Sequence, residues 1–357
     1  MGKRAFLLHD PNALPSNLHN LLKNEGIKVI MHPVCGEPTV TTVLSATTAA
    51  RAAGIDLVIG VGGGSVLDTA KATAALLTNA GDIYDYLEVI GRGKPLQQQS
   101  APCIAIPTTA GTGSEVTRNA VIAATEQKVK VSLRSPYLLP RLAVVDPELT
   151  ISLPPDITAA TGLDALTQLI EPFTCNATNP LTDALCREGM HRARLSLLRA
   201  CKNGNDTEAR EDMCLTSLFS GMALANSRLG AVHGFAAVIG GMFPAPHGAV
   251  CARLLPFVMK TNLHALQSRR PDDPILRRYA EIAQILTGKR QAKAEEGIER
   301  VEHMIHILSI PPLSNYGVNA SVFQKIVAGA KRGGSMKGNP VGLTEEELID
   351  ILERASW

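Results

Sequence analysis

The order of two hydrophobicity patterns along the sequence constrains the fold of this chain more than any other feature. Through residues 1–150, short apolar runs alternate with amphipathic stretches of helical length. The apolar runs are AFLLH, IKVIMH, DLVIGVG, CIAIPT and LAVVDP, at residues 5–9, 27–32, 56–62, 103–108 and 142–147. Such alternation predicts a parallel sheet with crossover helices. Gly26 and Gly54 are typical of the ends of two of these helices.

The pattern of apolar residues changes after LPPD, residues 153–156. From there the pattern has helical periodicity and few strand-like runs, with breaks at 179–180, 203–205, 240–241 and 311–312. A chain of 357 residues is also too long for one typical core, since most domains have about 100 to 200 residues. We therefore predict an α/β domain over residues 1–154 and an all-helical domain over residues 155–357.

Composition favours a small-molecule partner. The net charge of +2 gives no electrostatic reason to bind nucleic acid or a membrane surface, and aromatic residues at 4% supply few stacking platforms. The longest apolar region, residues 231–243, is shorter than the roughly 20 residues that span a bilayer. The seven cysteines form no CxxC pair and are odd in number. This usage indicates reduced thiols and a cytoplasmic protein.

The glycine-rich stretch GVGGGSVLDTAK, residues 60–71, follows a predicted strand and opens a predicted helix. Bare glycines allow close approach of a ligand, and the amides of a helix N-terminus favour phosphate. The stretch does not obey GxGxxG, because Ser65 takes the last glycine position, and it lacks the GK[ST] of a P-loop. By itself it fits a pyrophosphate site and a plain tight turn equally well.

A second polar loop, PTTAGTGSEVT at residues 107–117, also follows a predicted strand. Two such loops at the carboxyl ends of sheet strands define a dinucleotide crevice better than one. Asp10, at the end of the first strand, is suited to accept hydrogen bonds from ribose hydroxyls and would repel a 2′-phosphate. An Asp-Pro turn or a helix N-cap explains Asp10 equally well.

These two loops, with LPPDITAATGLDAL (153–166), VHGFAAVIGGMFPAPHGAVCA (232–252) and GNPVGLTEEELIDIL (338–352), make the chain resemble the iron-dependent (group III) alcohol dehydrogenase family. The resemblance covers nearly the full length, with the motifs in the family's order. It implies a Rossmann-like NAD(P)-binding domain, a helical metal- and substrate-binding domain, and a cleft between them. It further implies a homodimer that interconverts small alcohols with aldehydes or ketones. The expected cofactor-binding residues are Asp10, Gly63, Gly64, Ser65, Asp68, Thr108, Thr109, Thr112 and Lys130.

The resemblance also implies that Asp164, His233 and His247 are the metal ligands and carry the catalysis. Where the family has a histidine four residues after the aspartate, this chain has Gln168. It lies in GLDALTQLIEP, residues 162–172, which we expect to form the first turns of a helix. Gln168 is a weaker candidate for a fourth ligand. A histidine that the family often carries, and that is suspected of relaying protons, is Ala237 here.

Two of the expected ligands need a chain reversal between them. In one straight helix His233 and His247 would lie about 21 Å apart, too far for one ion. Glycines and prolines at 240, 241, 244 and 246 predict the break. Imidazole suits Fe(II) and zinc alike, so the loss of one histidine weakens the case for iron and leaves zinc plausible. Cys251 is a candidate lining residue, although a core position is its commoner role.

We predict an NAD(H)-dependent, metal-assisted alcohol dehydrogenase or aldehyde reductase, in which a cation acts as a Lewis acid on the alcohol oxygen. Three alternatives remain open. They are a metal-free reductase similar to maleylacetate reductases, a dehydroquinate synthase-like lyase, and a redox-inactive NAD-binding protein. The lyases need basic residues for a carboxylate- and phosphate-bearing substrate, and their motif set is not found here.

Overall fold

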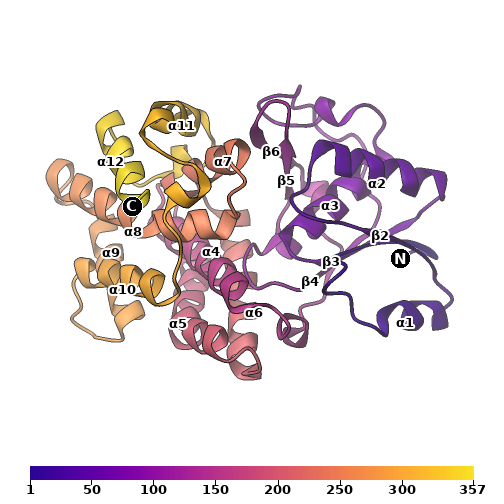
Figure 1. Cartoon of the computed structure of the whole chain (residues 1–357), viewed down its shortest axis with the longest axis horizontal. Helices are drawn as coiled ribbons and strands as arrows, with labels where there is room; N and C mark the ends of the chain where they lie inside the picture. The colour runs from indigo at the N-terminus through magenta and orange to yellow at the C-terminus, as the bar shows by residue number, and fades with distance from the viewer. The chain divides into compact units, whose positions relative to one another are not determined.

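A computed structural model describes all residues from Met1 to Trp357. The chain divides into two compact units (Figure 1). We call Met1–Thr109 with Gly113–Ser152 the sheet unit, and Ala110–Thr112 with Leu153–Trp357 the helical unit. The predicted fold class, a parallel α/β part followed by an all-helical part, is confirmed.

The sheet unit is built on five parallel strands in the order β2-β1-β3-β4-β7. These are β1 (Arg4–His9), β2 (Lys28–Pro33), β3 (Leu57–Gly62), β4 (Cys103–Pro107) and β7 (Leu142–Ala143). All five fall within the apolar runs predicted to be strands or extend one residue beyond them. β3 is buried along its whole length, as expected of a central strand covered on both faces, and this explains its unbroken apolar sequence.

Helices cover the two faces of this sheet (Figure 1). Phe6 and Leu8 pack with residues of α2 (Val40–Ala52) and α3 (Gly64–Thr78), whereas Leu7 faces α1 (Leu18–Asn24) on the other side. This alternation follows from the two-residue period of a strand. The predicted helix ends are confirmed, since Gly26 (φ 72°) and Gly54 (φ 61°) adopt the left-handed conformation that ends a helix.

An antiparallel hairpin in the sheet unit escaped prediction. It consists of β5 (Asn119–Ala124) and β6 (Val129–Arg134). Ile122, Val131 and Leu133 are buried against apolar residues of α2 and α3. The alternating apolar positions in VKVSLR carry the period of a half-buried strand and were the available signal.

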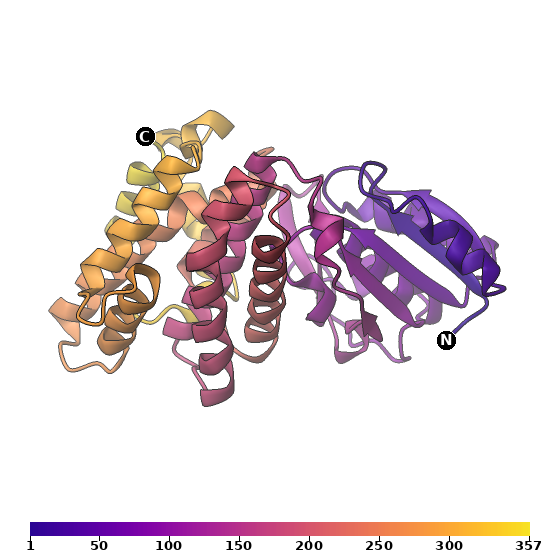
Figure 2. The same cartoon turned by 90° about the horizontal axis from the view of Figure 1, so that it is seen from below.

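Three of the predicted breaks in the helical unit, at 179–180, 203–205 and 311–312, fall at or between helix ends, but the break predicted at 240–241 is wrong, because one helix continues through both glycines to Met242. The helical unit contains nine α-helices. They are α4 (Pro155–Thr174), α5 (Pro180–Lys202), α6 (Thr207–Asn226), α7 (Ala231–Met242), α8 (His247–Arg269), α9 (Ile275–Thr287), α10 (Ala294–Ile307), α11 (Ala320–Arg332) and α12 (Glu345–Ala355). Both views show α4, α5 and α6 side by side (Figures 1 and 2). None of the helices combines the length and apolarity needed to cross a membrane.

One expectation about α4 is wrong. Residues 162–172 were expected to form the first turns of a helix, but α4 begins at Pro155, so Asp164 lies in its middle. A proline suits the first helical position, where no amide partner is needed. Gly162 does not start or stop the helix. A Cβ there would collide with Leu197 of α5 and crowd Met213 of α6, so this glycine permits close helix packing.

Candidate functional site

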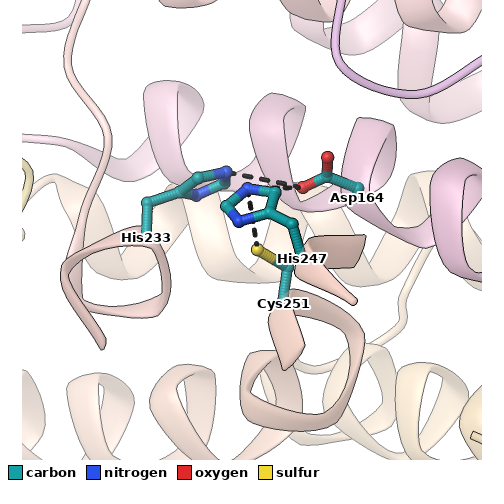
Figure 3. Close-up of side chains that lie close together, drawn as sticks. All are labelled: Asp164, His233, His247 and Cys251. Carbon is teal, nitrogen blue, oxygen red and sulfur yellow. Dashed lines mark hydrogen bonds and ion pairs between the residues drawn. The ribbon is translucent and has the colours of Figure 1, made fainter. Parts of the chain in front are cut away.

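Four side chains with metal-ligating atoms converge in the helical unit (Figure 3). Asp164 comes from the middle of α4, and His233 from the first turn of α7. His247 is the first residue of α8, and Cys251 follows one turn later on the same helix face. We call these four residues the ligand cluster.

Three spacings within the ligand cluster match those expected around one small cation. His233 Nε2 lies 3.5 Å and His247 Nε2 lies 3.8 Å from Asp164 Oδ1, and Cys251 Sγ lies 3.6 Å from His247 Nε2. All four ligand atoms lie within 4.8 Å of one another. Ligand atoms held tetrahedrally with bonds of about 2.0 to 2.3 Å would be about 3.3 to 3.8 Å apart.

Two atoms of the ligand cluster have no hydrogen-bond partner although they are buried. They are Asp164 Oδ1 and His233 Nε2, and their separation is longer than a normal N–H···O bond. An unsatisfied buried polar group costs about 1 to 3 kcal/mol, so native structures rarely keep one without a reason. A divalent cation would satisfy both atoms at once, and the residues present therefore fit such an ion.

The reversal between α7 and α8 brings the two histidines together as predicted. α7 ends at Met242, α8 starts at His247, and the two imidazole rings have centroids 5.5 Å apart. His247 keeps 33% of its side chain exposed, whereas Asp164 keeps 3%. The ligand cluster is thus open to solvent on the His247 side and closed on the Asp164 side.

Charges within the ligand cluster oppose the effect of burial. Burial disfavours a charged His247, but the Cys251 sulfur and Asp164 raise its pKa above the ordinary value. The same balance raises the pKa of His233 well above its ordinary value, with a contribution from Glu171. Burial also disfavours ionised Asp164, yet His247 and His233 lower its pKa. A cation binding here would compete with protons on the imidazoles.

Glu171 forms a hydrogen bond with the ring nitrogen of His233 that faces away from Asp164. Its Oε2 lies 2.6 Å from His233 Nδ1, and its Oε1 accepts a hydrogen bond of 2.7 Å from the Val232 amide. A carboxylate can only accept, so neutral His233 carries its proton on Nδ1 and turns the lone pair of Nε2 toward Asp164. Sequence reasoning missed this role, although Glu171 lies seven residues after Asp164 on one face of α4.

Gln168 lies one turn after Asp164 and is buried, but its amide group faces a different partner. Nε2 donates a hydrogen bond of 3.0 Å to the Gly111 carbonyl. Gly111 belongs to the segment Ala110–Thr112, which groups with the helical unit. Gln168 therefore anchors this segment, which also contains Thr112, and its service as a ligand stays a prediction.

The glycine-rich turn has the predicted strand-to-helix geometry. Gly63 is the N-cap of α3, and Gly64 and Ser65 are the first residues of that helix. A Cβ at Gly63 would lie 3.2 Å from Thr109 Cγ2, so the absence of a side chain lets the two polar loops pack closely. Thr108 joins them through its amide, which donates to the Gly62 carbonyl (3.0 Å).

Three other predicted cofactor residues already have partners within the sheet unit. Asp10 follows β1 at the point where the strand order reverses. Its amide donates to the Val61 carbonyl, and its carboxylate accepts from the Asn12 amide at 2.8 Å. The Asp68 carboxylate accepts hydrogen bonds from Ser114 Oγ (2.6 Å) and from the Val121 amide (2.8 Å). Lys130 Nζ pairs with Glu37 (3.0 Å).

The buried Lys71 completes this arrangement. Its ammonium lies 3.0 Å from Asp68 Oδ1 and donates to the Ser114 carbonyl at 3.0 Å and to Thr117 Oγ1 at 3.0 Å. Asp68 and Lys71 thus fix the second polar loop to α3. Asp68 lies just after the glycine-rich turn, and its hydrogen bonds help to hold the second polar loop in place.

A doubly wound sheet with a glycine-rich turn at its switch point, joined in one chain to a buried aspartate and two histidines, indicates a metal-assisted dehydrogenase that uses a dinucleotide. The family models agree. Residues 1–147 match the model of iron-containing alcohol dehydrogenase, and residues 158–356 match the C-terminal model of the Fe-containing alcohol dehydrogenase family. The chain belongs to the iron-containing alcohol dehydrogenase family.

Individual relatives match along almost the whole chain. Alcohol dehydrogenase 4 of Saccharomyces cerevisiae is 35% identical over 359 residues, covering 99% of this chain and 91% of the relative. The 1,3-propanediol dehydrogenase of Klebsiella pneumoniae is 35% identical over 368 residues, covering 99% and 92%. These relatives confirm the prediction of an oxidoreductase that acts on the alcohol group, and they do not favour the lyase or the metal-free reductase.

Solved structures of the family share the fold. A crystal structure of 1,3-propanediol oxidoreductase superposes with a TM-score of 0.89 at 33% identity, covering 99% of this chain and 92% of that one. Sulfoacetaldehyde reductase from Bifidobacterium kashiwanohense, solved in complex with NAD+, gives a TM-score of 0.85 at 26% identity and covers 99% and 91%. The predicted cofactors, NAD and a divalent metal, agree with this membership and with the ligand cluster.

Proposed function

We propose that this protein catalyses the reversible oxidation of a small primary alcohol to its aldehyde with NAD(H), and that Asp164, His233 and His247 hold the divalent cation that the reaction uses. The observation that carries the proposal is the pair of buried, unsatisfied atoms, Asp164 Oδ1 and His233 Nε2, which face each other. A bound cation would supply Lewis acidity that lowers the pKa of the alcohol. Asp164 supplies the negative charge for the site, and the partly exposed side chain of His247 marks the side from which an alcohol would enter.

We assign NAD(H) rather than NADP(H) because Asp10 places a carboxylate beside the switch point of the sheet. A 2′-phosphate near Asp10 would meet a like charge. The N-terminal amides of α3, from Gly64 and Ser65, are suited to the pyrophosphate. The complex of sulfoacetaldehyde reductase with NAD+ supports this cofactor.

The proposed substrate class follows from the named relatives. They include 1,3-propanediol dehydrogenase, choline dehydrogenase and 4-hydroxybutyrate dehydrogenase. All three names specify molecules with a terminal CH2OH group. We further propose a homodimer, as the family resemblance implies, and a cytoplasmic location, which the unpaired cysteines support.

The test separates the metal step from cofactor binding. Purified protein is assayed with a panel of primary alcohols and NAD+, with and without added Zn(II) or Fe(II), and NADH binding is measured by fluorescence. His247→Ala should abolish turnover and keep NADH binding, whereas His264→Ala, at an exposed position on the same helix, should keep both. Full turnover by metal-free protein would contradict the proposal and favour a metal-free reductase.

A further inference from the structure

We propose that Cys251 is a fourth metal ligand, which replaces the imidazole missing at position 168, and that the resulting set of one carboxylate, two imidazoles and one thiolate favours Zn(II) over Fe(II). The inference rests on the proposed metal-assisted function. It concerns a residue for which the sequence offered a lining role and favoured a core position.

The position of Cys251 differs from that of a core cysteine. Its side chain is fully buried, but its sulfur lies 3.6 Å from His247 Nε2 and within 4.8 Å of the ligand atoms of Asp164 and His233. A buried cysteine used for packing is surrounded by apolar atoms. Cys251 is the only one of the seven cysteines in a group of candidate ligands.

The unsatisfied atoms provide the second observation. Asp164 Oδ1 and His233 Nε2 are buried without a hydrogen-bond partner, and the ligand atoms of these two residues lie within 4.8 Å of the Cys251 sulfur. Three elements therefore direct donor atoms to one place, with α8 contributing both His247 and Cys251 (Figure 3). A spacing of four residues on a helix gives these two side chains the same direction.

Gln168 leaves the fourth position to another residue. Its amide nitrogen is committed to the Gly111 carbonyl at 3.0 Å. It could offer only a neutral amide oxygen, which is a weaker donor than a thiolate for zinc. The ligand lost from α4 is thus compensated from α8.

The sulfur changes which metal the site selects. Thiolate is a soft ligand that selects zinc in proteins, whereas carboxylate and imidazole alone accept several divalent metals. Zinc also accepts a fifth ligand, so four protein ligands leave access for a substrate. The ratio of zinc to iron affinity should therefore depend on Cys251.

Cobalt substitution tests the thiolate directly. The purified holoprotein is stripped with chelator and loaded with Co(II), and its near-ultraviolet spectrum is searched for sulfur-to-cobalt charge transfer. We expect this band in the unaltered protein and in Cys201→Ser, a matched control at a partly buried cysteine of α5. Cys251→Ala and Cys251→Ser should lose the band and bind Zn(II) at least about 10- to 100-fold more weakly, with a smaller loss for Fe(II).

A measurement on the unaltered protein tests the proposal even if the Cys251 variants fail to fold. X-ray absorption of the zinc-loaded protein should detect one sulfur at about 2.3 Å from the metal. Bound metal without a sulfur neighbour would overturn the role of Cys251 and leave the proposed function intact. Failure to bind any divalent metal, with full alcohol turnover, would overturn both.

Discussion

Replacing Glu171 with glutamine should weaken metal binding although Glu171 does not belong to the ligand cluster. The carboxylate accepts two hydrogen bonds, one from His233 Nδ1 at 2.6 Å and one from the Val232 amide at 2.7 Å. Glutamine has the same shape but only one acceptor oxygen. One of the two buried donors must therefore lose its partner.

The expected magnitude follows from that count. A buried donor without a partner costs about 1 to 3 kcal/mol, so the apoprotein should lose stability of this size. If His233 loses the partner, its ring is free to turn or to change tautomer, and Nε2 no longer points reliably to Asp164. Loss of such a partner typically weakens metal affinity about 10- to 100-fold, or about 1.4 to 2.8 kcal/mol.

Two measurements check this prediction. Competitive chelator titration with Zn(II) gives the metal affinity, and urea unfolding of the metal-free protein gives the stability. Glu188→Gln is the control, because Glu188 forms an exposed pair with Arg192 and such pairs contribute about 0 to 1 kcal/mol. Unchanged zinc affinity in Glu171→Gln would refute the claim that Glu171 orients His233.

Four other substitutions give distinct outcomes. Gln168→His should restore an imidazole and tighten metal binding roughly tenfold or more in a Cys251→Ala background, as measured by chelator titration; no gain would show that position 168 cannot reach the ion. Asp10→Gly should raise kcat/KM with NADP+ relative to NAD+ by roughly tenfold, since like charges at about 4 Å cost about 1 to 4 kcal/mol, and an unchanged ratio would contradict the assignment of NAD(H). Burial raises the pKa of Glu115, so the stability that Glu115 contributes is present below its pKa in the unfolded chain and is lost as pH rises through its pKa in the folded protein. Glu115→Gln should therefore become more stable relative to the unaltered protein as pH rises toward neutrality. A difference in urea unfolding that does not change with pH would contradict this prediction. Asp183→Ala removes two hydrogen bonds of 2.7 and 2.8 Å that Arg278 donates to Asp183. It should lower the free energy of unfolding by about 3 kcal/mol, because it leaves a partly buried guanidinium unpaired. A loss below about 1 kcal/mol in urea unfolding, the size typical of an exposed ion pair, would contradict this.

The parallel sheet was predictable because its strands carry their environment in their sequence. A central strand such as β3 is covered on both faces and reads as one apolar run. The hairpin of β5 and β6 was not predicted, since its alternation of buried and exposed residues is short and lies between two recognised strands. The start of α4 was placed too late, because residues 162–172 were expected to be its first turns, whereas the helix begins at Pro155. Gly162 lies inside the helix, where its small size permits close contact with α5 and α6.

The ligand cluster shows which parts of a site a single sequence can supply. A break between His233 and His247 was predictable from local chemistry, since Pro244 and Pro246 lie in the segment that separates α7 from α8. Gly240 and Gly241 were wrongly included in it, because α7 continues through both. The convergence of Asp164 on the same point was not, because it depends on how α4 packs against α8, and only the family resemblance suggested it. Cys251 shares its helix face with His247, so the four-residue spacing was visible in the sequence. The role proposed for Cys251 depends on the loss of the imidazole at position 168. A thiol beside a complete set of histidine ligands is not needed by the metal, whereas a thiol beside an incomplete set lies where another donor atom is required.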